Sequence, residues 1–216
     1  MTTIYLIRHG ESEGNLSGKI SGHLNVSLSE RGKLQAERIA DYFHGKGIEK
    51  IYSSDLKRAY DTVLPLAQRL SLNVETTPML REIKLGIWEG MKREEIISKY
   101  GDFWEQWEYR LCMDECIDGG ETRNQLGERV SRIFTEIVET NPDKTVMISS
   151  HSVAIRSILA FAMNISFSDS CKRFSSIPNA STTVLKYDNK EFSVIKAGIC
   201  DYLEDLKSSR ITSQQI

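Results

Sequence analysis

Arg8-His9-Gly10-Glu11-Ser12 directly follows the apolar run Ile4-Tyr5-Leu6-Ile7, which predicts a first β-strand over about residues 3–7. An arginine and a histidine therefore lie at the carboxyl end of this strand, which is where open α/β sheets bind their ligands. The glycine lets the backbone approach a ligand closely. Because histidine can act as a nucleophile and arginine is suited to holding phosphate, the stretch predicts an anion site that includes a nucleophile.

The rest of the chain alternates strand and helix, which predicts a single α/β domain over residues 1–206, built as a three-layer α/β/α sandwich with a mostly parallel central sheet. Residues 83–120 are expected to form a helical lid subregion, and residues 207–216 a polar tail. The predicted strands cover residues 3–7, 48–53, 72–76, 145–149, 182–187 and 191–196, the last as an antiparallel edge. The predicted helices cover residues 29–44, 56–70, 92–100, 103–111, 122–140 and 153–163.

Composition excludes several classes of protein. The chain has 216 residues, a net charge of −2 and 27% charged residues, so it lacks the basic excess of a nucleic-acid-binding protein. It has no apolar run of membrane-spanning length and no visible signal peptide, so no membrane partner is expected. The four cysteines, Cys112, Cys116, Cys171 and Cys200, form no zinc set and indicate reduced thiols in a cytoplasmic protein. Oligomeric state is not readable from these patterns, and a homodimer is the default expectation.

Four chemically active side chains follow predicted strands. His9 ends the first strand and His151 follows the strand at 145–149, so adjacent strands would bring both histidines to one edge of the sheet. Arg58 lies in the first turn of the helix after the second strand, a position that favours anions and is unfavourable for an arginine with only a structural role. Glu82 follows the third strand in a loop. Each residue alone would be read as an ordinary structural or solvated side chain, but together they predict one site.

The stretch at residues 8–12 resembles the signature of the histidine phosphatase superfamily, also called the phosphoglycerate mutase-like family. Further segments resemble that family's motifs in the expected order, over about residues 3–187, and they imply a phosphoglycerate mutase-like fold. These segments are the loop and first helix at Gly22–Ala36, the Ser-Ser-x-x-x-Arg-Ala element at Ser53–Ala59, the acid loop at Leu80–Gly90, the Gly-Gly-Glu-Thr box at Gly119–Thr122 and the second-histidine motif at Ser149–Ser152.

The resemblance implies a role for each catalytic candidate. His9 is expected to attack phosphorus and form a phosphohistidine, and Arg8, Arg58 and His151 to surround the phosphoryl oxygens. Glu82 is expected to protonate the leaving oxygen and then to accept a proton from the attacking water. No metal and no cofactor are required, because the arginines and histidine neutralise the phosphate.

Three further residues are expected to bind substrate. Asn15 and the backbone near Gly22 are predicted to donate hydrogen bonds to the phosphate. Ser152 stands where the family commonly has glycine, and it adjoins His151. His23 sits at a position where family members often carry another residue, and we leave open whether it lines the entrance to the site or is idle.

The family contains both phosphatases and mutases. The acid loop here has the shorter, phosphatase-like form, which favours a hydrolase acting on a small-molecule phosphate monoester. A mutase and a catalytically weak module that binds phosphorylated ligands are the alternatives. Trp104 and Trp107 lie in the predicted lid, where aromatic residues at helical spacing most often belong to the core but can also line a substrate cavity.

Overall fold

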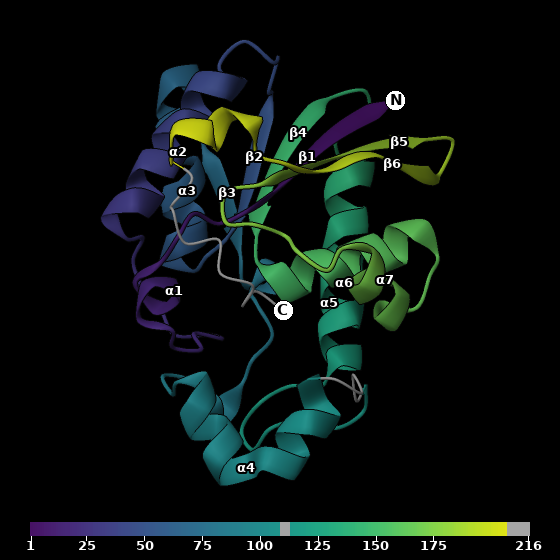
Figure 1. The fold of residues 1–216 in the computed structure, drawn as a ribbon. Helices are drawn as coiled ribbons and strands as arrows, with labels where there is room; N and C mark the ends of the chain where they lie inside the picture. Colours follow the sequence, from purple (N-terminus) through teal and green to yellow (C-terminus); the bar gives the residue numbers. More distant parts are fainter. Residues whose placement is uncertain (109–112, 207–216) are drawn as a thin grey trace.

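A computed structural model describes residues 1–108 and 113–206 and contains one six-stranded sheet in the order β3-β2-β4-β1-β5-β6 (Figure 1). Strands β3, β2, β4 and β1 are parallel, whereas β5 is antiparallel to β1 and β6 is antiparallel to β5. The mostly parallel sheet and the antiparallel edge are confirmed. The strands are β1 (Thr2–Arg8), β2 (Lys50–Ser54), β3 (Val74–Thr77), β4 (Thr145–Ser150), β5 (Thr182–Asp188) and β6 (Glu191–Ile199).

The register of β1 and β4 places the two predicted histidines side by side. Arg8, the last residue of β1, pairs with Ser150, the last residue of β4. His9 and His151 are the next residues on each strand, so they leave the sheet together at its carboxyl edge, as the sequence predicts.

Helices cover both faces of the sheet, which makes three layers (Figure 1). Helices α2 (Glu30–Phe43) and α3 (Lys57–Leu70) pack together on one face, with the short helix η3 (Asp201–Leu206) against α2. Helices α5 (Arg123–Glu139) and α6 (Ser152–Met163) pack together on the other face, and α7 (Phe167–Arg173) packs on α6. The remaining elements are α1 (Glu13–Ser17), η1 (Pro78–Leu80), η2 (Gly86–Trp88) and α4 (Arg93–Glu108), the last standing apart at one end of the sheet in Figure 1.

Each face of the sheet has its own apolar core. Ile39 and Phe43 of α2 pack in the core below α2 and α3, whereas Phe134 of α5 belongs to the larger core on the other face. The spacing of Leu34, Ile39, Tyr42 and Phe43 predicts one apolar face for α2, but Leu34 and Tyr42 are exposed. The buried face of α2 instead includes small residues and Gln35, because the chain of the signature stretch runs close against it: a Cβ at Gly32 would lie 2.0 Å from the Glu11 carbonyl oxygen.

Some local structure departs from the sequence prediction. The sequence predicts a loop after β1, but Ser12 caps the short helix α1, and the helix α7 is also absent from the prediction. The two helices predicted at 92–100 and 103–111 are confirmed as two helical segments that meet at a kink at Tyr100 (φ −134°, ψ 29°) and share the label α4, and residues 109–112 lie outside the described chain. Asn189 and Lys190 both have positive φ, which is typical of the tight turn that joins β5 to β6.

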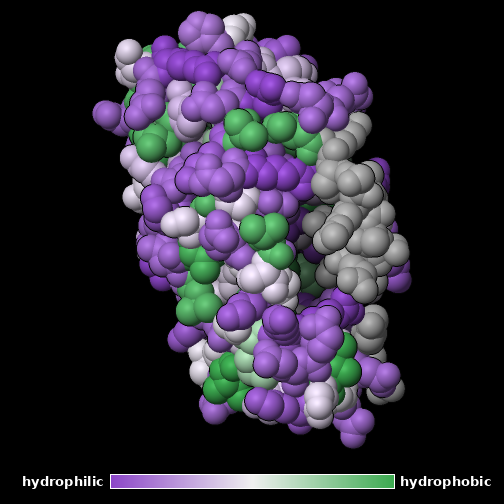
Figure 2. Space-filling view, turned by 60° about the vertical axis from the view of Figure 1, so that its left-hand side comes forward, coloured by the Kyte–Doolittle hydropathy of each residue, from purple (hydrophilic) through white to green (hydrophobic). Residues whose placement is uncertain are grey.

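The face of the molecule seen in Figure 2 is mainly hydrophilic, with apolar side chains in small separate groups. Within residues 1–108 and 113–206, no helix combines the length and apolar character needed to cross a bilayer. Cys116, Cys171 and Cys200 are free thiols, and Cys112 lies outside the described residues, as does the predicted tail at 207–216.

Candidate active site

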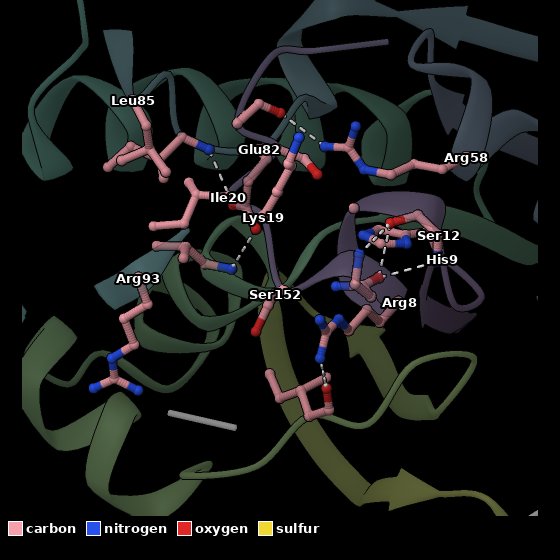
Figure 3. A pocket seen from close by; sticks show the side chains of 18 of the residues that line it. Arg8, His9, Ser12, Lys19, Ile20, Arg58, Glu82, Leu85, Arg93 and Ser152 are labelled. Atoms are coloured by element: carbon pink, nitrogen blue, oxygen red, sulfur yellow. Dashed lines mark hydrogen bonds between the residues drawn. The ribbon is translucent and has the colours of Figure 1, made fainter. Parts of the chain in front are cut away.

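A pocket of about 330 Å³ opens at the carboxyl edge of the sheet, and most of the predicted site residues line it (Figure 3). His9 and Arg8 come from the end of β1, Arg58 from the start of α3, and Glu82 from the loop after η1. His151 does not line the pocket surface. It is fully buried beneath it, with its ring centroid 5.0 Å from that of His9. We call this part of the pocket, with these five residues, the inner end.

The His9 ring is held in one tautomer. Its Nδ1 lies 2.7 Å from the carbonyl oxygen of Gly10, and because a carbonyl only accepts hydrogen bonds, Nδ1 must carry the proton. Nε2 is then left with a free lone pair. Burial, and secondly the charges of Arg58 and Arg8, hold the pKa of His9 well below its ordinary value. The ring is therefore neutral and oriented, and its Nε2 lone pair can accept a proton or act as a nucleophile.

The two arginines are anchored by backbone carbonyls. Arg58 donates from Nη1 to the Leu24 carbonyl and from Nη2 to the Gly22 carbonyl, both at 2.8 Å, and Arg8 donates to the Ile177 carbonyl. Burial lowers the pKa of each guanidinium to about 10, which leaves both charged at neutral pH. Fixed and charged guanidinium groups of this kind are suited to binding phosphate oxygens.

Four buried nitrogen atoms around His9 have no hydrogen-bond partner in the described part of the chain: Nε of Arg8, Nε of Arg58 and both ring nitrogens of His151. Burial, and secondly Arg58, hold the pKa of His151 below its ordinary value. Buried polar groups normally have partners, so a cluster of unpartnered nitrogens is typical of a site that binds an anion with several acceptor atoms. In the same described residues, no group of three or more histidine, cysteine, aspartate or glutamate side chains could hold a metal ion.

The Glu82 carboxylate is fixed at the start of α6. It accepts hydrogen bonds from the backbone N–H groups of Ile83, Val153 and Ala154, at 3.0, 3.1 and 3.1 Å. The positive end of the helix dipole also faces a carboxylate in this position. Glu82 therefore lies in the pocket with a defined orientation, across from Arg58 in Figure 3.

The three predicted substrate-binding residues all line the pocket, in different ways. Oδ1 of Asn15 accepts from Ser12 and Asn179, which leaves its NH₂ group as the donor for a ligand. Gly22 has φ +46°, and its carbonyl accepts a hydrogen bond from Arg58, so the backbone group of Gly22 that can donate to a phosphate is its N–H. The Ser152 hydroxyl accepts a hydrogen bond from Arg156.

Several residues that hold the site in place were not predicted from the sequence. Thr62 accepts a hydrogen bond from Gly10 N–H and donates one to the Arg58 carbonyl, which ties the signature stretch to α3. Arg129 and His23 both contact the backbone carbonyl of Glu82, each at 2.8 Å, so His23 is part of the support for the acid loop. A threonine one turn after Arg58 is the only sequence signal for Thr62, and Arg129 looks like an ordinary polar residue of an amphipathic helix.

The far side of the pocket is formed by Arg93, Trp104, Trp107 and Glu108, all from α4, and we call it the outer wall. Both tryptophans are buried and pack on Trp88, with ring centroids 5.5 Å from it. They also line the pocket. Trp104 and Trp107 are therefore both core residues and part of the cavity wall, the two possibilities that the sequence leaves open.

The fold and the inner end define an α/β protein with a pocket, centred on His9 and two charged arginines, at the carboxyl edge of its sheet. Residues 4–199 match the family model described as histidine phosphatase superfamily (branch 1), and the chain belongs to that family. It is 33% identical to phosphoserine phosphatase 1 of Hydrogenobacter thermophilus, over 94% of this chain and 95% of that one. It is 29% identical to phosphoglycerate mutase-like protein 4 of Arabidopsis thaliana, over 94% and 87% of the two chains. Its fold matches the solved structure of Bacillus stearothermophilus YhfR with a TM-score of 0.87 and 25% identity, covering 94% of this chain and 100% of that one.

Proposed function

We propose that this protein is a phosphatase that hydrolyses small-molecule phosphate monoesters through a phosphohistidine on His9. The observation that carries the proposal is the neutral, oriented His9 ring: its Nδ1–H is fixed on the Gly10 carbonyl, so Nε2 faces a phosphate as a lone-pair nucleophile. The four unpartnered nitrogens around it support the placement of the phosphoryl group.

In the first step, Nε2 of His9 forms a bond to phosphorus and the ester P–O bond breaks. Glu82 gives a proton to the leaving oxygen, which departs as an alcohol. In the second step water attacks phosphorus, the N–P bond breaks, and Glu82 takes the water proton, so inorganic phosphate is released and the free site is restored. Arg8, Arg58 and His151 stabilise the charge on the equatorial oxygens in both steps.

Hydrolysis of p-nitrophenyl phosphate without added metal tests this proposal. We expect turnover by the wild type and none by His9→Ala. Glu82→Gln should slow esters of poor leaving groups more than p-nitrophenyl phosphate, because a poor leaving group needs the proton most. Turnover that survives in His9→Ala would sink the phosphohistidine mechanism.

A mutase is the alternative activity that experiment can distinguish from a phosphatase. The similarity to a phosphoglycerate mutase-like protein favours the mutase as the second candidate. A mutase returns the phosphoryl group to an organic hydroxyl and releases little inorganic phosphate, so phosphate release from 3-phosphoglycerate separates the two activities. The similarity to phosphoserine phosphatase 1 makes O-phosphoserine the first substrate to assay for hydrolysis.

A further inference from the structure

The Gly-Gly-Glu-Thr box lies directly against the acid loop, and Gly120 forms an isolated backbone bridge with Leu85. The backbone N–H of Glu121 donates to the Lys84 carbonyl at 3.0 Å, and the Lys84 N–H donates to Oε1 of Glu121 at 2.8 Å. A Cβ at Gly120 would lie 2.8 Å from the same carbonyl oxygen, so a larger side chain would push the two segments apart. The box therefore holds the acid loop just beyond Glu82.

Arg129 of α5 uses its whole guanidinium group to join this box to the acid loop. Its Nη1 donates to the carbonyl oxygens of Met79 and Arg81, at 2.9 and 2.8 Å, and its Nη2 donates to the Glu82 carbonyl at 2.8 Å. Its Nε and Nη2 also donate to the two carboxylate oxygens of Glu121, at 3.0 and 2.5 Å. All five N–H groups of this arginine thus have acceptors, and the side chains of the ion pair are both only 15% exposed.

The backbone and the carboxylate of Glu82 are held by different helices. Residues 81–84 run between η1 and η2 outside any helix or strand, so donors from neighbouring elements set the position of this backbone. Arg129 supplies these donors from α5, whereas the backbone N–H groups at the start of α6 orient the carboxylate. A carboxyl group must lie within hydrogen-bond reach of the leaving oxygen to protonate it, and a displacement of about 1 Å can slow a reaction about 100-fold.

We propose that Arg129 and Glu121 act together as positioning residues for the general acid, holding the Glu82 carboxyl at the place from which it protonates the leaving oxygen. Neither residue is among the described residues that line the pocket, so both act through Glu82. The Gly-Gly-Glu-Thr box thereby has a role in cleavage of the ester bond. This inference rests on the proposed phosphatase function, in which Glu82 is the acid.

The dependence of the rate on the leaving group tests the proposal. p-Nitrophenolate leaves readily without a proton, whereas phenol needs one, so we compare kcat/KM for p-nitrophenyl phosphate and phenyl phosphate. This constant reports the steps up to release of the phenol and excludes the later loss of phosphate from His9. Arg129→Met should lower kcat/KM for phenyl phosphate about tenfold more than for p-nitrophenyl phosphate, in the same direction as Glu82→Gln. Arg129→Lys should recover part of the loss, because an ammonium cannot reproduce the planar fork.

A merely structural role would leave the ratio of the two kcat/KM values unchanged, because loss of folded protein lowers the rate with both esters by the same factor. In the Glu82→Gln background, Arg129→Met should not change the ratio further, because the acid that it positions is absent. Arg132→Met is the matched control, since Arg132 is an exposed arginine about one turn further along α5, and it should keep the ratio of the wild type.

The outcomes separate this inference from the proposed function. An unchanged ratio in Arg129→Met, in a protein whose ratio does change in Glu82→Gln, would overturn the positioning role and leave the phosphatase function intact. An equal shift caused by Arg129→Met in the Glu82→Gln background would overturn it too. If Arg129→Met does not fold, the ratio in Arg129→Lys decides in the same way. If Glu82→Gln leaves the ratio unchanged, or the wild type hydrolyses neither ester, the proposed function fails and the inference fails with it.

Discussion

The inner end and the outer wall of the pocket are built in different ways. At the inner end, the catalytic candidates come from the ends of β1 and β4, the start of α3 and the loop after η1, and backbone groups fix the arginines, His9 and Glu82. The outer wall comes from one helix, α4, whose tryptophans are held by packing on Trp88. Backbone hydrogen bonds hold the inner-end side chains in one orientation, whereas the tryptophans of the outer wall are positioned by side-chain packing. The two ends of the pocket should therefore respond differently to substitution.

After the loss of the nucleophile itself, the largest effect is expected from Arg58→Ala. The change removes a charge from the phosphate and also releases the carbonyls of Gly22 and Leu24, so kcat/KM for p-nitrophenyl phosphate should fall by about 10³. Arg58→Lys should recover only part of the loss, because an ammonium cannot hold both carbonyls as the planar fork does. Arg69→Lys, an exposed change in the same helix, should stay near wild type. A loss of less than tenfold in Arg58→Ala would show that Arg58 does not stabilise the bound phosphate in the way proposed.

A dependence of stability on pH is expected from the two buried histidines. Their pKa values are lowered in the folded protein, so below about pH 6.5 the unfolded chain binds protons that the folded chain does not. Keeping the two rings neutral therefore costs no stability above that pH. As the pH falls below it, the free energy of unfolding falls by up to about 1.4 kcal/mol per pH unit for each ring.

Urea unfolding between pH 7.5 and pH 5 measures this slope. The double variant His9→Asn/His151→Asn should lose stability less steeply with falling pH than the wild type. Identical slopes in the two proteins would mean that these rings are not held neutral by burial.

A smaller effect is expected from Thr62→Val, which removes the hydroxyl between Gly10 and Arg58 at nearly constant shape. The buried Gly10 N–H loses its partner, which should lower the free energy of unfolding by about 1–3 kcal/mol. Thr62→Ser keeps the hydroxyl and is the matched control. Thermal unfolding of both variants measures the change in stability. Equal losses of stability in Thr62→Val and Thr62→Ser would show that the hydroxyl group is not responsible for the loss.

The smallest effects are expected at two glycines, Gly22, whose carbonyl holds Arg58, and Gly101 in α4, the helix of the outer wall. A Cβ at Gly22 would lie 2.3 Å from Oε1 of Glu89, and its φ of +46° disfavours an alanine, so Gly22→Ala should cost about 1–2 kcal/mol. A Cβ at Gly101 in α4 meets no atom within 4 Å, so Gly101→Ala should be neutral or stabilise the protein by up to about 1 kcal/mol. Chemical denaturation measures the free energy of unfolding of both variants. An equal cost at the two positions would show that the backbone at Gly22 is no more constrained than the backbone of α4.

The sequence predicts the catalytic candidates of the inner end better than the residues that hold them in place. His9 and His151 could be placed together because each ends an apolar strand, and parallel strands share one edge. Arg58 was found because the first turn of a helix is an unfavourable place for an arginine with only a structural role. Glu82 was found because its loop resembles the family's acid loop. Thr62 and Arg129 could not be found in this way, because they hold the site through backbone atoms far along the chain and no periodicity marks them.

Errors in the predicted fold have similar causes. Leu34 and Tyr42 are apolar at helical spacing, yet they face solvent because the buried face of α2 accommodates the close approach of the signature stretch. The short helix α1 depends on a cap formed by Ser12 and Asn15, which lies in a glycine- and serine-rich segment that favours a loop.

Trapping of the phosphorylated protein tests the central claim most directly. Wild-type protein mixed briefly with p-nitrophenyl phosphate and quenched in base should carry one phosphate on the peptide that contains His9, stable in alkali and lost in acid, as detected by mass spectrometry. Glu82→Gln should still form this species. Phosphate on a different residue, or hydrolysis at full rate with no phosphate on His9, would contradict the account.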